Sequence, residues 1–482
     1  MALTDAGGAA PPGERVQLDD VAMTPFLKRV TVFSGGGPFL DGYVLSIIGV
    51  ALIQIGPELG LDGRATGAVG VAAIVGLFLG TSIGGWLTDR IGRKRMFVLD
   101  IIGIAVISLA TAFVPSAAAL VAMRFLIGIV VGADYPIATS LVAEFTPRRY
   151  RAISMGVIAA AWYVGANVAF LVGYLLLSVD GGWRWMLASA VVPCLLILVG
   201  RWDIPESPRW LARKGRVDEA TAIVRRIFGV DVDLEPETTQ TAPYSALFRR
   251  GQIGKVLFVG TIWMCQAVPM FAIYTFGPQI MTDLGFGERQ TATLGQIVIG
   301  TFFMVGCIPA MFWANSWGRR KLLIGSFAIM TAALATLGTL PTAGAGVVVL
   351  CLATYAFFSG GPGNLQWLYP NELFPTDIRA SAVGAAMAFS RIGTVVSTYV
   401  LPSFLLTHGS QATLLAGAAI SGVGLLVSVL LAPETRGLTL NQTSTLGLAH
   451  WGRPARVGPH GATARPTPEP TDARGQTKEV GP

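Results

Sequence analysis

The segment Glu144-Phe-Thr-Pro147-Arg-Arg-Tyr-Arg151 recurs 228 residues further along the chain (372 − 144) as Glu372-Leu-Phe-Pro375-Thr-Asp-Ile-Arg379. Both copies read Glu-x-x-Pro-x-x-x-Arg, and each follows a long apolar stretch. One match of this length can arise by chance. Its meaning therefore depends on whether other segments repeat at the same distance.

Two further pairs of segments repeat at nearly that distance. Gly92-Arg93-Lys94 recurs as Gly318-Arg319-Arg320 after 226 residues (318 − 92), and Pro205-Glu206-Ser207 recurs as Pro433-Glu434-Thr435 after 228 residues (433 − 205). Three matches at one spacing indicate a duplicated unit. Two parallel repeats are typical of transporters that rock two helix bundles about a central site.

The composition places the chain in a lipid bilayer. Of its 482 residues, 52% are hydrophobic and only 13% are charged, and the mean hydropathy is +0.60. Soluble domains carry about a quarter charged residues, and about 20 apolar residues cross the hydrocarbon layer as a helix. Twelve stretches of this kind predict twelve transmembrane helices, at 30–55, 65–87, 96–114, 118–142, 152–178, 183–202, 256–281, 292–313, 322–340, 346–367, 381–406 and 412–431.

The formal net charge of +7 reflects topology rather than a nucleic-acid partner. With both termini cytoplasmic, the outer loops carry only Arg64, Arg184 and Arg289, and the remaining surface Lys and Arg face the cytoplasm. This is the positive-inside pattern. We therefore predict a multi-pass protein of the inner (plasma) membrane with both termini cytoplasmic and no nucleic-acid partner.

Five regions follow from this pattern. We expect a cytoplasmic N-terminal segment at 1–29, six-helix bundles at 30–202 and 256–431, a cytoplasmic linker at 203–255, and a cytoplasmic, mostly disordered tail at 432–482. Apolar and basic residues alternate with helical spacing in the first part of the linker, which predicts amphipathic helices along the membrane face. The tail is rich in Pro, Gly, Thr and Arg and shows no periodicity.

Several motifs, in order along the chain, resemble those of one transporter superfamily. Gly85-Trp-Leu-Thr-Asp89-Arg90-Ile-Gly92-Arg93-Lys94 is similar to the loop motif of the major facilitator superfamily, and Arg124-x-x-x-Gly128-x-x-x-Gly132 is similar to its fourth-helix motif. Pro205–Leu211, Trp367–Pro375 and Pro433–Gly437 resemble signatures of its sugar-porter branch. The resemblance implies an all-α membrane protein with the major facilitator fold. Its 12 transmembrane helices would form two six-helix repeats around a central cavity, and we expect a monomer.

Departures from the sugar-porter pattern leave the substrate open. Sugar porters carry an aspartate in the first helix where this chain has Val44, and paired glutamines in the seventh helix where it has Cys265 and Gln266. The segment Gly132-Ala-Asp134-Tyr135-Pro136 resembles the fourth helix of proton–phosphate symporters. Those carriers place an aspartate in the seventh helix, and 256–281 contains none, which argues against phosphate as the substrate. We expect a small polar metabolite: an organic acid, a polyol or a sugar.

Three charged residues inside predicted spans are candidates for proton coupling: Asp41, Asp134 and Arg124. An ionised group at the centre of a membrane helix costs about 2.5–3.5 kcal/mol, so each needs a partner or a polar cavity. Asp41 lies one turn before Val44, and we predict that it takes up the coupled proton; the alternative is a permanently paired structural carboxylate. Asp134 is a second proton carrier, a site for a cationic substrate, or a cap for backbone groups freed by Pro136. Arg124 is either the partner of Asp41 or an anchor at the membrane surface.

Polar and aromatic residues in the middle of predicted helices are the candidates for substrate binding. Amide and aromatic side chains hydrogen-bond to hydroxylated solutes and stack on ring-shaped ones, whereas contact between helices is the alternative role of each. Gln266 and Trp367 also match sugar-porter positions, and Arg391 either binds an anionic substrate or pairs locally. The full set is Tyr43, Trp162, Asn167, Gln266, Tyr274, Gln296, Asn364, Gln366, Trp367 and Arg391.

Charged residues at the cytoplasmic ends of the helices form a predicted gate. Salt bridges among them would hold the two bundles together while the cavity faces outward, and would break as it opens inward. Asn315 replaces the aspartate in the second copy of the loop motif, so we expect the two copies to be unequal. The gate residues are Asp89, Arg93, Glu144, Arg151, Arg209, Arg319, Glu372, Arg379 and Glu434.

The sequence predicts a transporter rather than an enzyme, with no cofactor and no metal. Its four cysteines lie inside predicted helices, its three histidines lie in a loop and the tail, and it has no phosphate loop and no nucleophile motif. The energy must then come from a gradient. We predict a secondary active transporter for proton-coupled uptake by alternating access, with lipid, protons and a small molecule as its partners. The alternatives are a proton-antiport exporter and a transport-inactive membrane sensor.

Overall fold

The structure, a computed structural model, describes residues 16–17, 23–145, 148–228, 232–233, 252–286, 289–340, 344–374 and 378–436. The predicted tail therefore lies outside the described residues from position 437 onward, as does the linker segment 234–251. Helices account for nearly all of the described chain.

The described residues of the first half, up to Arg201, form eight helices. The first predicted span consists of two helices, α1 and α2, with only Gly35 between them, and Asp41 lies in the second of these. The sixth predicted span is likewise made of two short helices, α7 and α8. The bounds are α1 Pro25–Ser34, α2 Gly36–Leu59, α3 Gly63–Ile91, α4 Arg93–Thr111, α5 Ala117–Phe145, α6 Arg148–Leu176, α7 Gly182–Ala188 and α8 Val191–Arg201.

The second half is built in the same way. Its last helix has 53 residues and is interrupted at Gly409, whose φ of 80° lies in the left-handed region that glycine tolerates, so it comprises two spans. The bounds are α11 Gln252–Met281, a π-helical turn Thr282–Phe286, α12 Arg289–Ser316, α13 Arg319–Thr339, α14 Ala345–Leu373 and α15 Arg379–Leu431.

Short elements lie in the linker and before the first half. The amphipathic prediction for the linker corresponds to α9 Pro208–Arg213 and α10 Val217–Phe228. The strands β1 Val16–Gln17 and β2 Val232–Asp233 pair in parallel.

Ten helices among the described residues are long and apolar enough to cross a membrane. The count falls short of twelve for two reasons. One of the ten contains both parts of α15, and α4 carries Lys94, Arg95 and Asp100 within its 19 residues. A helix of 19 residues is about 28 Å long, which matches the hydrocarbon layer. The twelve predicted spans therefore all correspond to helical segments.

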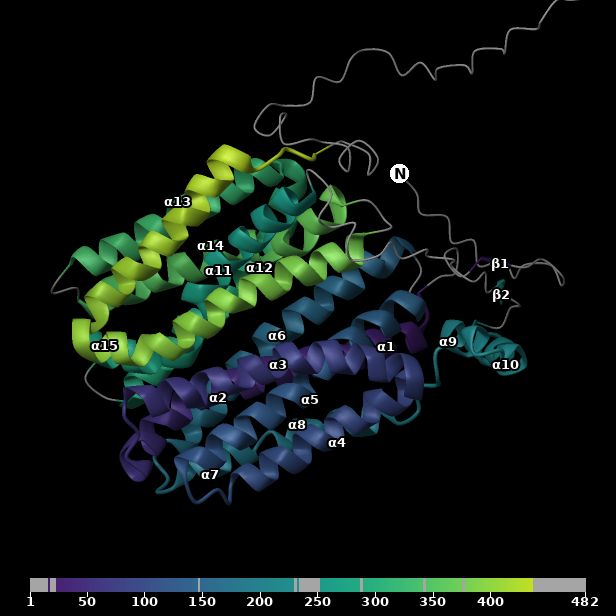
Figure 1. Cartoon of the computed structure of the whole chain (residues 1–482), viewed down its shortest axis with the longest axis horizontal. Helices are drawn as coiled ribbons and strands as arrows, with labels where there is room; N and C mark the ends of the chain where they lie inside the picture. The colour runs from purple at the N-terminus through teal and green to yellow at the C-terminus, as the bar shows by residue number, and fades with distance from the viewer. Residues whose placement is uncertain are drawn as a thin grey trace, which may run out of the picture.

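The two halves lie side by side as two bundles (Figure 1), with α1–α8 in purple to blue and α11–α15 in teal to yellow. We call the end of the bundles beside α9 and α10 the linker end and the opposite end, where the turns at Gly60, Gly181 and Gly409 lie, the far end. The halves meet where α2 contacts α11, α3 contacts α15 and α6 contacts α12.

Glycines allow this approach toward the far end. A Cβ on Gly49 of α2 would lie 2.6 Å from the Thr275 carbonyl oxygen of α11, and one on Gly67 of α3 would overlap the Tyr399 carbonyl of α15. Backbones this close are typical of membrane helix pairs, in which small residues replace the hydrophobic driving force.

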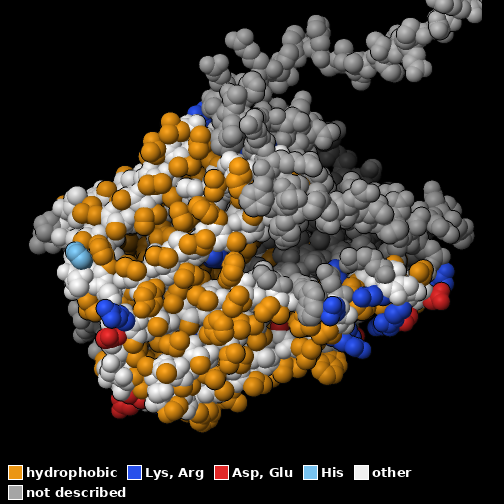
Figure 2. All heavy atoms as spheres, in the orientation of Figure 1, with side chains coloured by type: hydrophobic (Ala, Val, Ile, Leu, Met, Phe, Trp, Pro, Cys, Tyr) orange, Lys and Arg blue, Asp and Glu red, His pale blue; other side chains and the backbone are white. Residues whose placement is uncertain are grey.

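The outer surface is apolar over both bundles. Figure 2 shows hydrophobic side chains over most of the coloured part of the visible face, with Lys, Arg, Asp and Glu mainly beside α9 and α10 and at the opposite end. Val106, Leu196 and Leu350 are each more than 60% exposed, which in water would be an aggregation hazard. The bundle surface is therefore suited to contact with lipid.

Candidate transport site

Asp41 lies inside the first bundle and is held by a tryptophan. Its carboxyl group is 2% exposed, and the indole Nε1–H of Trp162 donates to Oδ2 over 2.7 Å. The two residues come from α2 and α6, whose backbones touch, because a Cβ on Gly42 would overlap the Trp162 carbonyl. The structure thus joins the predicted proton acceptor to a predicted substrate residue.

Trp162 in turn packs against the second half. Its ring centroid lies 5.1 Å from that of Tyr274 and 6.2 Å from that of Phe271, both of α11 and both in edge-to-face geometry. The guanidinium of Arg391, in α15, lies 5.5 Å from the centre of the Phe271 ring. One side chain therefore connects Asp41 with residues of both bundles.

Arg124 is directed into the bundle. It is 2% exposed, and Nη1 donates to the Val44 carbonyl of α2 over 2.8 Å. This places it one turn from Asp41 rather than at the membrane surface. Its Nε and Nη2 have no hydrogen-bond partner within the described part of the chain.

Asp134 is paired with an arginine that the sequence analysis did not select. Arg201 of α8 lies 2.8 Å from Asp134 of α5 and 3.4 Å from Asp100 of α4, and all three side chains are at most 1% exposed. The contact differs from the predicted capping of backbone groups at Pro136. Asp100 and Arg201 were detectable by the same criterion as Asp134, since both are charged residues inside predicted spans.

Three of the predicted substrate residues, one each from α6, α11 and α12, hold buried polar atoms without a hydrogen-bond partner in the described part of the chain. Tyr274 is 1% exposed and Gln296 is fully buried, yet the tyrosine hydroxyl and both amide atoms of Gln296 lack hydrogen bonds within the described residues. Oδ1 of Asn167 also lacks a hydrogen-bond partner within the described residues, although Nδ2 of the same amide donates to the Tyr163 carbonyl over 2.9 Å. Buried polar groups are rarely left unpaired, so these atoms indicate a place for a bound molecule or water.

Other predicted substrate residues make contacts within one half. Gln266 of α11 donates to Ser359 of α14 over 3.1 Å, and Asn364 donates to the Cys307 carbonyl over 2.8 Å. Tyr43 lies 2.6 Å from the hydroxyl of Ser189. Trp367 is 40% exposed and packs edge-to-face on Trp263, and Gln366 leaves its Oε1 without a partner among the described residues. Trp367 is therefore not buried among the residues around Trp162.

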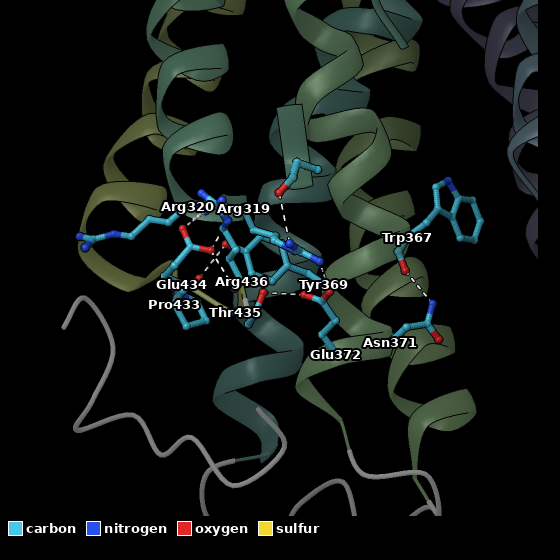
Figure 3. A network of polar contacts seen from close by, with 11 residues as sticks. Arg319, Arg320, Trp367, Tyr369, Asn371, Glu372, Pro433, Glu434, Thr435 and Arg436 are labelled. Atoms are coloured by element: carbon cyan, nitrogen blue, oxygen red, sulfur yellow. Dashed lines mark hydrogen bonds and ion pairs between the residues drawn. The ribbon is translucent and has the colours of Figure 1, made fainter. Parts of the chain in front are cut away.

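The linker end of the second half carries a connected set of polar contacts (Figure 3). Arg319 Nη2 lies 2.8 Å from Glu372 Oε1, and Thr435 donates to the other carboxylate oxygen over 2.5 Å. Glu434 accepts hydrogen bonds from the backbone N–H groups of Arg319 and Arg320 over 3.0 and 3.2 Å. Tyr369 donates to the Pro433 carbonyl over 2.9 Å. Three predicted gate residues therefore meet here.

The first half repeats the main feature of this set. Glu206 accepts from the backbone N–H groups of Arg93 and Lys94 over 2.9 and 3.1 Å, as Glu434 does in the second copy. Both carboxylates lie at the start of a helix, α4 or α13, where unpaired N–H groups and the helix dipole favour negative charge. The duplication thus extends to matching interactions, and Glu206 is a residue that the predicted gate omitted.

These contacts differ from the predicted gate in one respect. Each of them joins residues of the same half, whereas the prediction was that such pairs bridge the bundles. The physical reason is that Glu206 and Glu434 accept from the N–H groups at the start of an earlier helix of their own repeat, α4 or α13. The side chains of Asp89, Glu144, Arg151, Arg209 and Arg379 lie outside the described part of the structure.

A cavity of about 320 Å³ lies between the halves on their far-end side. Its lining comes from α2, α3, α11 and α15 and includes Asp62, Thr66, Gln279 and Asp283. No predicted substrate residue lines it. We place the candidate site at Trp162 instead, because its indole contacts both Asp41 and Tyr274, and the Tyr274 hydroxyl is buried without a hydrogen-bond partner among the described residues.

Comparisons with known proteins agree with this architecture. Residues 30–446 match the family described as Sugar (and other) transporter. YaaU of Escherichia coli (strain K12) is 58% identical over 428 residues, which cover 89% of this chain and 97% of that protein. The inner membrane metabolite transport protein YgcS of the same strain is 38% identical over 438 residues, covering 90% and 98%.

The fold also matches a solved structure. The inward open conformation of the xylose transporter XylE from E. coli superposes with a TM-score of 0.73 at 22% identity, covering 88% of this chain and all of that one. The chain belongs to the sugar (and other) transporter family. It is a multi-pass membrane transporter with the twelve-helix major facilitator fold, and not an enzyme.

Proposed function

We propose that the chain is a secondary transporter that couples uptake of a small polar metabolite to protons by alternating access. The observation that carries this proposal is the contact between Asp41 and Trp162, which links a buried ionisable group to the interface of the two halves. We further propose that both termini are cytoplasmic in the inner membrane, because basic residues gather at the linker end and such residues favour the cytoplasmic side. We also propose that the protein works as a monomer.

Protonation of Asp41 changes the hydrogen bond that holds Trp162. An ionised carboxylate accepts a stronger hydrogen bond from an N–H group than a neutral carboxyl does, so the tryptophan is held firmly only while Asp41 is charged. Because Trp162 packs on Tyr274 and Phe271 of the other half, a change in its position alters the contact between the bundles. A ligand or proton shifts such an equilibrium only through differential contacts in the two states, and this contact is one.

Arg124 is the natural counter-ion for the ionised form. It already donates to the Val44 carbonyl, one turn along α2 from Asp41, and two of its buried N–H-bearing nitrogens have no partner within the described residues. A buried cation without an anion is costly. We infer that loss of the proton from Asp41 is compensated by Arg124.

The unpartnered groups suggest the chemistry of the substrate. Tyr274, Gln296 and Asn167 offer hydroxyl and amide groups, which match the hydroxyl or carboxyl groups of a polyol, a sugar or an organic acid. Aromatic faces at Trp162 and Tyr274 provide apolar walls of the kind that small-molecule sites use. Arg391, beside Phe271, would favour an organic acid over an uncharged solute.

The remaining gate residues are proposed to act at the linker end during closure. The carboxylates of Glu206 and Glu434 keep the helix starts of each repeat rigid. The halves can then move as bodies, which alternating access requires.

Uptake into proteoliposomes tests the proposal. The purified chain is reconstituted, an inward proton gradient is imposed, and a panel of labelled sugars, polyols, organic acids and cations is supplied. Accumulation of one class, abolished by a protonophore, supports proton-coupled uptake. Expulsion of a preloaded solute, with no uptake of any member of the panel, would instead identify an exporter.

A further inference from the structure

A cluster of three buried charges in the first half contains more acid than base. Arg201 of α8 contacts Asp134 of α5 through Nη1 over 2.8 Å and Asp100 of α4 over 3.4 Å. Arg201 is fully buried and both carboxyl groups are 1% exposed. One guanidinium thus faces two carboxyl groups, and we call these three residues the Arg201 cluster.

Within the described residues, the hydrogen bonds leave one carboxylate oxygen of the cluster and Nη2 of Arg201 without a partner. Arg201 Nε and Nη1 also donate to the carbonyls of Phe33 and Phe97, over 3.1 and 2.8 Å. Asp100 Oδ1 accepts from the Ile101 N–H over 2.7 Å. Asp134 Oδ2 has no partner among the described residues and abuts the Cα of Gly37 in α2. With both acids ionised, the cluster would carry a buried net charge of one negative unit, which burial strongly disfavours.

The groups around the cluster do not supply the missing positive charge. Cys194 of α8 lies near Asp100 and Arg201, and Asp41 lies one turn beyond Gly37 on α2; neither is a cation. Arg29 of α1 reaches the Gly200 carbonyl, but its side chain is 41% exposed and it pairs with Asp203. Within the described residues, Arg201 is the cation in contact with either acid.

A proton meets this need better than a metal ion. Hard cations in proteins take about six oxygen ligands, whereas the cluster offers a single unpartnered carboxylate oxygen. The two carboxyl groups lie beside one another, because both contact the same nitrogen, Nη1 of Arg201, over 2.8 Å from Asp134 and 3.4 Å from Asp100. Two carboxyl groups in such contact share one proton, because two adjacent like charges disfavour double ionisation.

We propose that the Arg201 cluster binds one proton, shared between Asp100 and Asp134, as a second proton site on the linker-end side of Asp41. Asp134 meets α2 at Gly37, four residues or about 6 Å before Asp41. A proton that leaves the Asp41 carboxyl can therefore pass to the cluster after the cluster has released its own proton toward the linker end. This role in transport rests on the proposed proton coupling, but the occupancy of the cluster does not.

Infrared spectroscopy of the purified full chain measures this occupancy directly, through the C=O stretch of buried protonated carboxyl groups at neutral pH. The parent protein carries Asp41→Asn, which removes the other buried acid of the proposed path. We expect a protonated-carboxyl band in this parent and its loss on adding Asp134→Asn or Asp100→Asn, because the remaining acid then pairs with Arg201 as a neutral ion pair. Asp62→Asn, at the exposed start of α3, is the control and should leave the band intact.

Several results would overturn the proposal. They are absence of the band in the folded parent, its persistence in both double variants, and sodium-dependent thermal stabilisation, relative to N-methylglucamine, that requires the two acids. If one double variant fails to fold, the other carries the test. A failure of proton-driven uptake alone would contradict the proposed function while leaving the infrared result unchanged, so the two failures can be distinguished.

Discussion

The close approach of α3 and α15 at the far end makes a single methyl group a sharp perturbation. A Cβ at Gly67 would overlap the Tyr399 carbonyl oxygen and lie 3.1 Å from its carbonyl carbon. Because backbone atoms of a membrane helix have little freedom to move aside, Gly67→Ala must separate the two helices by about 1 Å to restore ordinary contact. Overpacking of this kind costs about 1–3 kcal/mol.

That cost falls only on the arrangement in which the far end is closed. Alternating access requires a second arrangement in which α3 and α15 separate there, so Gly67→Ala should shift the equilibrium toward it by about 5- to 150-fold. Gly56 is the matched control, because a Cβ there has nothing within 4 Å. Gly56→Ala should leave the equilibrium unchanged.

Thiol labelling measures the shift. Thr398 of α15 is 1% exposed, and its side chain lies beside Gly70 of α3 where the halves meet, so a Thr398→Cys reporter is protected while the far end is closed. With a membrane-impermeant maleimide supplied from the far-end side, labelling should be faster in Gly67→Ala than in Gly56→Ala by up to the same factor. The protein without the reporter gives the background of the four native cysteines. Equal labelling of the two folded variants would refute the inference that this contact is specific to one state.

Three further variants test separate contacts. Trp162→Phe keeps an aromatic ring, smaller than the indole, but removes the donor to Asp41. A hydrogen bond to a charged group contributes about 1.5–3 kcal/mol, so proton-driven uptake should fall about tenfold or more while solute exchange without a gradient survives. Equal loss of both would argue against a role in coupling. Tyr274→Phe removes a hydroxyl without a partner among the described residues, so it should cost no thermal stability but lower the apparent substrate affinity about tenfold. Tyr369→Phe loses the hydrogen bond to Pro433 and should lower the free energy of unfolding by about 1 kcal/mol. The reverse pattern in thermal unfolding and uptake assays would contradict the assignment. Glu206→Gln and Glu434→Gln should each lower the unfolding temperature, because both weaken charged caps at helix starts, and an effect confined to one of them would show that the repeats are not equivalent.

The fold could be predicted because its determinants repeat along the chain. Twelve apolar stretches and three segment pairs at one spacing are properties of the linear sequence, and the hydrocarbon layer leaves a helix as the simplest way to satisfy the backbone. Boundaries were less certain where a span is broken, as at Gly35 and between α7 and α8. There the hydropathy is continuous while the helix is not.

The candidate site was predicted only in part, because its contacts join distant segments. Asp41 and Trp162 could each be identified from the sequence, because a charged or polar aromatic residue is unusual inside a predicted span. Their hydrogen bond could not, because 121 residues separate them and the bond depends on how α2 and α6 pack. Asp100 lies close behind the basic start of its helix and Arg201 at the end of its own. Charges in those places are typical of membrane-interface anchors, which concealed a buried cluster.

The predicted gate shows a different limit. Spacing identified Arg319, Glu372 and Glu434 as one group, and the structure brings them together. Spacing alone does not reveal whether a carboxylate pairs across the bundles or caps an earlier helix of its own repeat. That choice depends on the backbone at Gly92 and Gly318, whose positive φ values of 111° and 95° present the helix start to the glutamate.

Proton movement on addition of substrate tests the coupling at Asp41 most directly. Proteoliposomes in weakly buffered medium receive the solute identified by the uptake panel, and the external pH is followed for the wild type and for Asp41→Asn. Proton-coupled uptake predicts a rise in external pH with the wild type that a protonophore abolishes, and none with Asp41→Asn, although this variant still exchanges labelled for unlabelled solute. An equal pH rise with the folded Asp41→Asn variant would contradict the assignment of proton coupling to Asp41.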